Sequence, residues 1–276
     1  MTTPYQPPGA TATYTSPIPV RPARLGDAIA SEWTKIRTLR STMWTLGVMV
    51  ALLFGIGALT TWIVDATDDN AEFVRNDVLS LGFFGAILST ICVITLGVLT
   101  VTSEYNTGMI RTTMTACPSR ARVLTAKAIV YFVLVFTAMT VTTLLLGAVQ
   151  VGIAGGEPNG EQWLRATLGV SFYLACLGLL SMAVGVLIRH SAGAITVMFG
   201  VVLLPLVMAV FMATAGSLQS FGTWLIEYSV PSQLGVVYDE GLMTSGVAGW
   251  EPLLIIVGLT AAALGGAYAA LAARDV

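Results

Sequence analysis

The chain has 276 residues, of which 55% are hydrophobic and 10% are charged, and its formal net charge at pH 7 is −2. Soluble domains carry about 25% charged residues. A soluble protein of this composition would lack the polar side chains that cover a water-exposed surface, so we assign the chain to the integral membrane proteins. A mean hydropathy of +0.82 supports this class.

The N-terminal segment, residues 1–24, is rich in proline and threonine and has no apolar core of the kind found in a cleavable signal peptide. We predict a disordered cytoplasmic tail, followed by one membrane domain over residues 25–276. Within 25–40, an apolar residue recurs every three or four positions, which favours an amphipathic helix at the inner membrane interface. An ordinary charged flank of the first span is the alternative. The apolar positions are Leu25, Ile29, Trp33 and Ile36.

Six stretches are apolar and about 20 residues long, the length that a helix needs to cross the hydrocarbon core. In the first, Trp44 and Trp62 are separated by about 27 Å of helix, so each indole would lie at one membrane interface. Small residues four apart, such as Gly47, Ala51 and Gly55, predict close helix packing. The predicted fold class is all-α, with six transmembrane helices at about 43–64, 78–102, 128–153, 166–188, 192–215 and 252–272.

The basic residues are distributed very unevenly over the predicted loops. Of the 13 Lys and Arg residues, only Arg75 and Arg165 fall on one side of the membrane, and the other 11 fall on the opposite side or at its edge. Because basic loops stay in the cytoplasm, we predict that both termini are cytoplasmic and that the outer surface is acidic.

Three classes of function are disfavoured by what the spans lack. No predicted span carries a charged residue near its centre, whereas ion-coupled transporters generally need one. The single histidine, His190, lies in a short turn, which disfavours a membrane enzyme built on a Ser–His or zinc site. The chain also lacks GxxxxGK[ST], so active transport would require energy from another polypeptide. We expect no catalytic residue, cofactor or metal in this chain.

The connector between the second and third spans is basic and longer than a turn needs. Residues 109–116 (MIRTTMTA) have helical spacing, Gly108 permits a sharp change of direction before them, and Pro118 ends the helix. Ser119 is expected to cap the next helix, which continues into the third span. The residues alone leave two interpretations open, a coupling element and a basic loop that only sets topology.

Residues 103–127, SEYNTGMIRTTMTACPSRARVLTAK, resemble the corresponding connector of type-2 ATP-binding-cassette exporter permeases. The segment SEWTKIRTLRST, the six-span layout and the closing ARDV are also similar to that family, especially to its actinobacterial members. Met109 departs from the pattern, since the family usually has Thr there. The matching positions are Glu104, Tyr105, Gly108, Ile110, Arg111, Thr112, Pro118, Arg120 and Lys127.

The resemblance implies a multi-pass permease in a bacterial cytoplasmic membrane, paired with a second six-span subunit, identical or related. A separate ATPase subunit, which binds ATP and Mg, would dock on the 104–120 connector. Drugs, peptides and lipids are all substrates of relatives. Whether Glu104 and Arg111 pair is left open. The residues expected to couple to the ATPase are Glu104, Gly108, Met109, Ile110, Arg111, Met114, Pro118 and Arg120.

The outer segment 216–250 is too polar for a full span, because it contains Glu227, and Pro231 interrupts its helical spacing. We predict two short helices at about 219–229 and 231–238, which the resemblance identifies as re-entrant. An exposed loop is the alternative. The resemblance also places spans two and five at the dimer centre. The candidate residues of the substrate path, for which ordinary packing is the alternative, are Phe83, Phe84, Ser89, Phe199, Met208 and Met212.

Overall fold

The computed structural model describes residues 24–67, 77–117, 119–213, 218–238 and 246–273, and all regular structure in these ranges is helical. The predicted tail lies outside this part of the chain, apart from Arg24. Six helices are long and apolar enough to cross a membrane, which confirms the six-helix prediction. The third begins at Arg120 and not at 128, and the fourth begins at Gly160 and not at 166, because the polar connectors continue them as helix. The six helices span Arg40–Ala66, Val78–Asn106, Arg120–Ala154, Gly160–Ile188, Ser191–Met212 and Glu251–Ala273.

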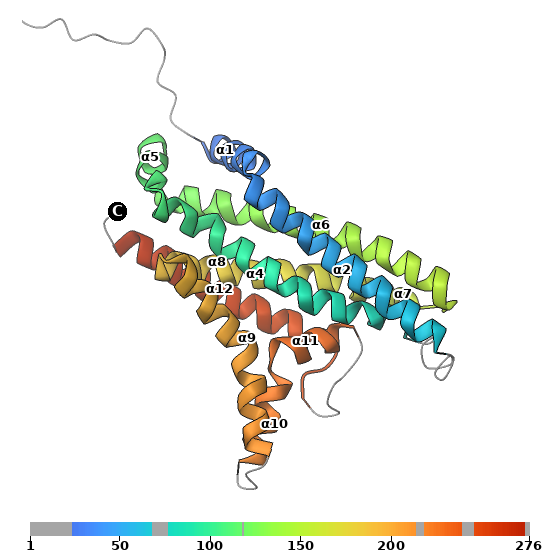
Figure 1. Ribbon diagram of the computed structural model, residues 1–276. Coiled ribbons are helices and arrows are strands. Elements are labelled where there is room, and N and C mark those ends of the chain that lie inside the picture. Colours follow the sequence, from blue (N-terminus) through green and yellow to red (C-terminus); the bar gives the residue numbers. More distant parts are fainter. Residues whose placement is uncertain (1–23, 68–76, 118, 214–217, 239–245, 274–276) are drawn as a thin grey trace, which may run out of the picture.

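Five helices run side by side in a bundle: α2 (Arg40–Ala66), α4 (Phe83–Asn106), α6 (Arg120–Ala154), α8 (Val170–Ile188) and α12 (Glu251–Ala273) (Figure 1). The centre of the bundle is formed by α4 and α8. In their most apolar stretches 61% and 72% of the residues are buried, compared with 22% in α2 and 17% in α12. The core of the protein therefore lies between α4, α8 and the parts of α2 and α6 that cover them.

Two glycines allow the central helices to approach closely. A Cβ atom on Gly97 of α4 would lie 2.4 Å from the carbonyl oxygen of Gly178 in α8, and one on Gly85 would lie 2.4 Å from the oxygen of Leu53 in α2. Small residues permit such backbone contact. Gly47 and Gly55, for which the same packing was predicted, face open space in this chain, so that part of the prediction is wrong within one subunit.

Short elements extend two of the long helices at the end of the bundle opposite to α1. The five-residue segment η1 (Val78–Gly82) leads into α4, and α7 (Gly160–Leu164) with the π-helical turn η2 (Arg165–Gly169) leads into α8. Asn159 caps α7, since its side chain accepts a hydrogen bond from the backbone N–H of Gln162 at 2.9 Å.

The fifth long helix, α9 (Ser191–Ala213), leaves the bundle along its length and projects from it together with α10 (Gln219–Glu227) (Figure 1). Near the end of α9, a Cβ atom on Gly222 of α10 would lie 3.0 Å from that of Met212, so the two helices pack on each other. The next helix, α11 (Val230–Val237), returns to the bundle and buries Leu234 and Val237. Two short helices lie where 219–229 and 231–238 were predicted, and Pro231 stands in the first turn of the second, a position that suits proline.

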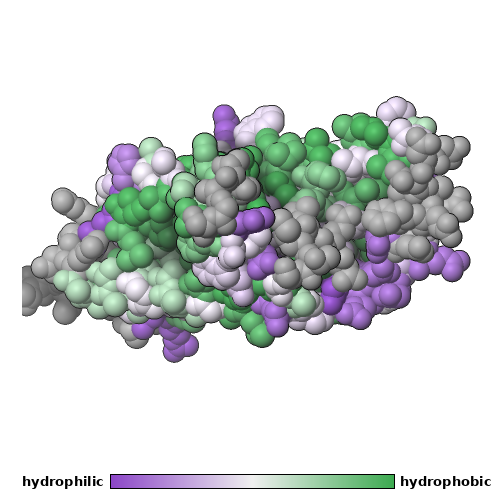
Figure 2. Space-filling view, turned by 90° about the horizontal axis from the view of Figure 1, so that it is seen from below, coloured by the Kyte–Doolittle hydropathy of each residue, from purple (hydrophilic) through white to green (hydrophobic). Residues whose placement is uncertain are grey.

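Two more helices lie at one end of the bundle, near the last turn of α12: α1 (Leu25–Thr38) and α5 (Met109–Ala116) (Figure 1). Leu39, in an extended conformation, separates α1 from α2. On the face from which α9 and α10 project, broad hydrophobic areas are interrupted by smaller hydrophilic groups (Figure 2).

Candidate functional site

The connector folds as its sequence predicts. At the end of α4, Gly108 has φ = 72°, in the left-handed region that favours glycine, and the chain turns there into α5. Cys117 is extended and ends α5, and α6 begins at Arg120. The predicted cap at Ser119 is only partly correct, because the backbone is extended there but the side chain makes no capping hydrogen bond. Pro118 lies outside the described residues.

One side of α5 is exposed and the other rests on its own chain. Met109 is 48% exposed, and Thr112 and Thr115 are exposed as well. Ile110 is only 8% exposed and packs inward, toward the bundle, so it lies outside the exposed side of α5, and its role in ATPase coupling stays a prediction. The side chains of Arg111 and Met114 lie outside the described part of the structure.

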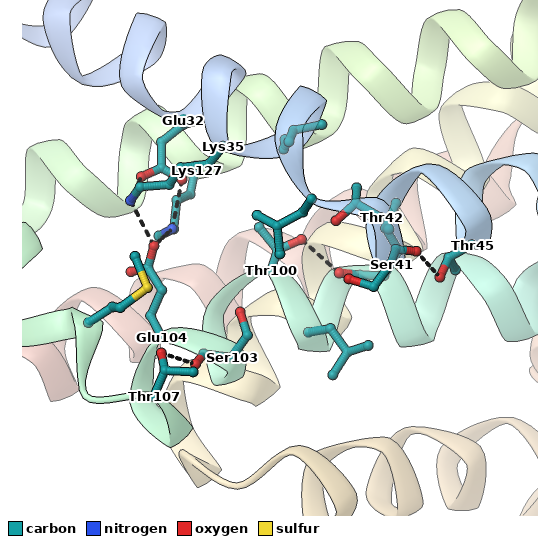
Figure 3. A pocket seen from close by; sticks show the side chains of 15 residues that line it. Glu32, Lys35, Ser41, Thr42, Thr45, Thr100, Ser103, Glu104, Thr107 and Lys127 are labelled. Carbon is teal, nitrogen blue, oxygen red and sulfur yellow. Dashed lines mark hydrogen bonds and ion pairs between the residues drawn. The ribbon is translucent and has the colours of Figure 1, made fainter.

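Four charged side chains from three helices form a closed ring at the base of the connector (Figure 3). We call Glu32 and Lys35 of α1, Glu104 of α4 and Lys127 of α6 the charge ring. The Lys35 ammonium lies 2.7 Å from Glu32 Oε1 and 2.8 Å from Glu104 Oε1. The Lys127 ammonium lies 2.7 Å from Glu32 Oε2 and 2.6 Å from Glu104 Oε1. Each charge therefore has two neighbours of opposite sign.

The charge ring is largely shielded from solvent. The side chains of Glu32, Glu104 and Lys127 are 4–7% exposed, and that of Lys35 is 25% exposed. Burying an isolated charge costs several kcal/mol, and alternating neighbours offset this cost. Burial alone would lower the pKa of Lys35, but hydrogen bonds to Glu104 and Glu32 outweigh it and hold the pKa above its ordinary value. Glu104, one of the residues expected to couple to the ATPase, therefore faces inward and contacts the two lysines of its own chain.

The local sequence explains how α1 reaches the ring. Asp27 accepts a hydrogen bond from the backbone N–H of Arg24 at 2.9 Å and fixes the start of the helix. Glu32 lies between Ile29 and Ile36 at helical spacing, so it belongs to the apolar face that α1 turns toward α6. A carboxylate on that face is carried into the bundle, where Lys127 meets it.

Two cavities border the charge ring, and Lys35 and Met109 line both of them. The first, of about 210 Å³, lies between α1, the start of α2 and the inner part of α4 (Figure 3). The second, of about 350 Å³, lies between α1 and α5 and is also lined by Asp27, Ser31 and Thr112. The helix α5 therefore stands away from α1 over part of its length.

Other contacts join the connector to distant helices. Arg120, one of the residues expected to couple to the ATPase, donates from Nη1 to the backbone oxygen of Leu271 in α12 at 2.8 Å, so part of its guanidinium binds the bundle. At the end of α4, the guanidinium of Arg189 lies 5.3 Å from the ring centre of Tyr105, and Asn106 donates to Ser191 Oγ at 3.3 Å. The turn between α8 and α9 thus lies against the start of the connector.

The six predicted path residues do not form one surface. Ser89 is fully buried and donates to the backbone oxygens of Met49 and Gly85, and Phe83 is 6% exposed and packs on Tyr238. Neighbouring helices of the same chain cover both side chains in this conformation, and their assignment to a path stays a prediction. Phe199 packs partly buried against the core and Met212 lies against α10, whereas Phe84 and Met208 are exposed.

Among the residues that the structure describes, no group of three or more His, Cys, Asp and Glu side chains could hold a metal ion. The Nδ1 atom of His190 accepts a hydrogen bond from the backbone N–H of Gly193 at 3.0 Å, at the start of α9. Through this contact, the single histidine of the chain accepts a hydrogen bond from the first turn of α9.

Comparison with known proteins agrees with these features. The sequence model of a family described as "ABC-2 family transporter protein" matches residues 28–216, a range that contains most of α1, the charge ring, α5 and the first five long helices. No curated protein matches the chain significantly.

Proposed function

Because the chain belongs to the ABC-2 family of transporter proteins, we propose that it is the permease subunit of an ATP-binding-cassette exporter and is driven by a separate ATPase subunit. ATP and Mg would be bound by that subunit. The chain would lie in a bacterial cytoplasmic membrane, with both termini and α5 on the cytoplasmic side and the α10–α11 segment on the outer side.

The observation that carries this proposal is the exposed helix α5. It is bounded by Gly108 at a positive φ and by extended Cys117, and it leaves Met109 and Thr112 open to solvent at the end of the bundle. A short helix in this position offers a partner an apolar side chain and hydroxyl groups, and these are accessible without any movement of the membrane-spanning helices. Arg111, which belongs to the same helix, would add a guanidinium for directional hydrogen bonds.

The exposed apolar surface of α9 supports pairing with a second six-span subunit, identical or related. Only 17% of the residues in the most apolar stretch of α9 are buried. Lipid could cover such a surface, but α9 also projects out of the bundle with α10, and so exposes a long apolar face. The exposed residues on it include Leu203, Leu204, Val207 and Val210.

The α10–α11 segment has the side chains expected of a helix pair that lies at the outer membrane interface or re-enters the membrane there. Phe221, Trp224 and Tyr228 of α10 form an exposed aromatic row, with ring centres 5.8 and 5.2 Å apart. Aromatic rings of this kind are enriched at the interfaces of the bilayer. On α1, Leu25 and Trp33 are exposed at the opposite end, which suits a helix lying at the inner interface.

The charge ring favours a permease over an ion-coupled transporter. The buried charged residues in the described ranges are Glu32, Glu104 and Lys127, and together with Lys35 they neutralise one another near the end of the bundle. A coupling ion would need a titratable group along the path, whereas these groups serve as structural partners.

The test is to purify the chain through an affinity tag from its native membranes and to identify the proteins that remain bound. We expect an ATP-binding subunit in the complex, and ATP hydrolysis that responds to candidate exported compounds. A stable chain that captures no ATP-binding protein, and that transports in vesicles without ATP, would overturn the proposed function.

A further inference from the structure

The charge ring joins parts of the chain that are far apart in sequence. Glu104 and Lys127 are 23 residues apart, and the connector with α5 lies between them. Their contact at 2.6 Å closes this segment at its base. Glu32 and Lys35 attach α1 to the same base, across separations of 95 and 69 residues. Both ends of the connector and α1 therefore meet at one point.

Direct contact between α1 and α5 is limited, because the cavity of about 350 Å³ separates them. Lys35 lines this cavity and is also a member of the ring. The ring thus joins α1 to the base of the connector that carries α5. A displacement of that base reaches α1 through the ring.

The chemistry of the ring makes this link stiff. Apolar side chains can slide and repack with small changes in energy, but a buried charge that loses its partner keeps the full cost of desolvation. Moving α1 away from α4 and α6 would separate Lys35 from Glu104 and Glu32 from Lys127 together. Displacement of the connector base therefore carries α1 with it.

We propose that Glu32, Lys35, Glu104 and Lys127 are positioning residues that make α1 and the α5 connector move as one body. The consequence rests on the proposed function: an ATPase that displaces α5 also displaces α1. The side chains of Leu25 and Trp33 on α1 are exposed and would move with it. The interfacial helix then becomes a moving part of the transport cycle and not a passive anchor.

The test uses spin labels on one exposed residue of each helix, Thr34→Cys in α1 and Ala116→Cys in α5, so that Met109 and Thr112 stay unmodified. The native cysteines, Cys92, Cys117 and Cys176, are replaced by alanine. Distance distributions are measured by double electron–electron resonance on the full chain in lipid nanodiscs. The decisive variant is Glu104→Met/Lys127→Met, which removes both charges together and leaves the Glu32–Lys35 pair satisfied.

Two further variants separate positioning from general stability. Thr102→Val changes another fully buried polar residue of α4, whose hydroxyl donates only within its own helix, to the oxygen of Val98. Lys127→Arg retains the positive charge of the ring. We expect one narrow distance population in the parent chain, in Thr102→Val and in Lys127→Arg. We expect a second, longer population in the double methionine variant.

Identical distributions in the parent chain and the folded double variant would overturn the proposal, and so would a long population in Thr102→Val. This measurement needs no ATPase. The same labels in the complex captured from native membranes test the consequence: during ATP hydrolysis the α1–α5 distance stays constant in the parent chain and changes in the double variant. If no ATPase is captured, the proposed function fails, whereas the distances in the isolated chain still decide the proposal about the ring.

Discussion

The base and the tip of the connector follow opposite physical rules. At its base, three of the four ring residues are buried, and each carboxylate and ammonium meets two partners of opposite sign at 2.6–2.8 Å. At its tip, α5 follows a left-handed glycine and exposes Met109 and Thr112. Substitutions at the base should therefore change the folding of the permease, and substitutions at the tip should change what the permease binds.

The largest effect is expected for Lys127→Met. The substitution leaves Glu32 and Glu104 with Lys35 as their remaining ring partner, so the buried cluster gains a net negative charge. Removal of one partner from a buried ion pair costs about 3–5 kcal/mol. We expect a marked fall in the thermal unfolding temperature and in the yield of monodisperse protein, measured in detergent by size-exclusion chromatography and by scanning fluorimetry. A variant as stable as the parent chain would show that the charges are not coupled.

A smaller effect is expected when both charges are removed. In Glu104→Met/Lys127→Met, no buried charge is left without a partner, and methionine fills a volume close to that of either side chain. The double variant should be more stable than Lys127→Met alone, a non-additivity that is typical of groups in contact. Thermal unfolding of the parent, both single variants and the double variant gives the coupling free energy. Additive effects would break the distinction between base and tip.

At the tip, Gly108→Val should affect binding more than folding. A β-branched residue at φ = 72° costs about 1–2 kcal/mol, and the chain can avoid this cost by redirecting α5. We expect an inserted permease with a nearly unchanged unfolding temperature but with less bound ATPase. The measurement is ATPase recovered per permease after affinity purification. Complete loss of the folded permease would place Gly108 with the base instead.

The smallest effect is expected from pH. The pKa of Lys35 is raised above its ordinary value of 10.5 by Glu104 and Glu32, and Lys127 shares both carboxylates. A raised pKa gives a stabilisation that is complete below 10.5 and is lost as the pH rises through the higher folded value. The α1–α5 distance should therefore be constant between about pH 7 and pH 9 and should spread only in more alkaline buffer. Spreading within that neutral range would contradict the ring geometry.

Much of the fold could be predicted from the sequence, because membrane-spanning helices can be recognised by the length and the hydropathy of their apolar stretches. The helix at 109–116 could also be predicted, since Gly108 precedes it and its spacing is helical. Which face of a span packs could not be predicted, because lipid and protein interiors both accept apolar residues. Gly47 and Gly55 therefore looked like Gly85 and Gly97, although only the latter pair meets another backbone closely.

The charge ring was missed for a different reason. Its members come from three helices and are up to 95 residues apart, so no local pattern connects them. Two signals were available: Glu32 stands on the apolar face of its helix between Ile29 and Ile36, and Lys127 enters a long apolar helix. A buried charge on an apolar face requires a partner of opposite sign. This rule would have predicted that Glu104 faces inward, toward Lys127. Ile110 was assigned outward because the periodicity of a short helix does not show which side meets the chain.

The central claim is that an ATPase subunit engages the tip of the connector at α5. Its most direct test is ATPase capture from native membranes by the tagged parent chain, by Arg111→Ala in α5 and by Arg40→Ala at the exposed start of α2. Both substitutions remove one positive charge on the predicted cytoplasmic side, so Arg40→Ala is a matched control. If the ATPase binds at α5, Arg111→Ala loses most of the captured ATPase, whereas Arg40→Ala retains it. Equal capture by all three proteins would show that Arg111 and the tip of the connector do not bind the ATPase.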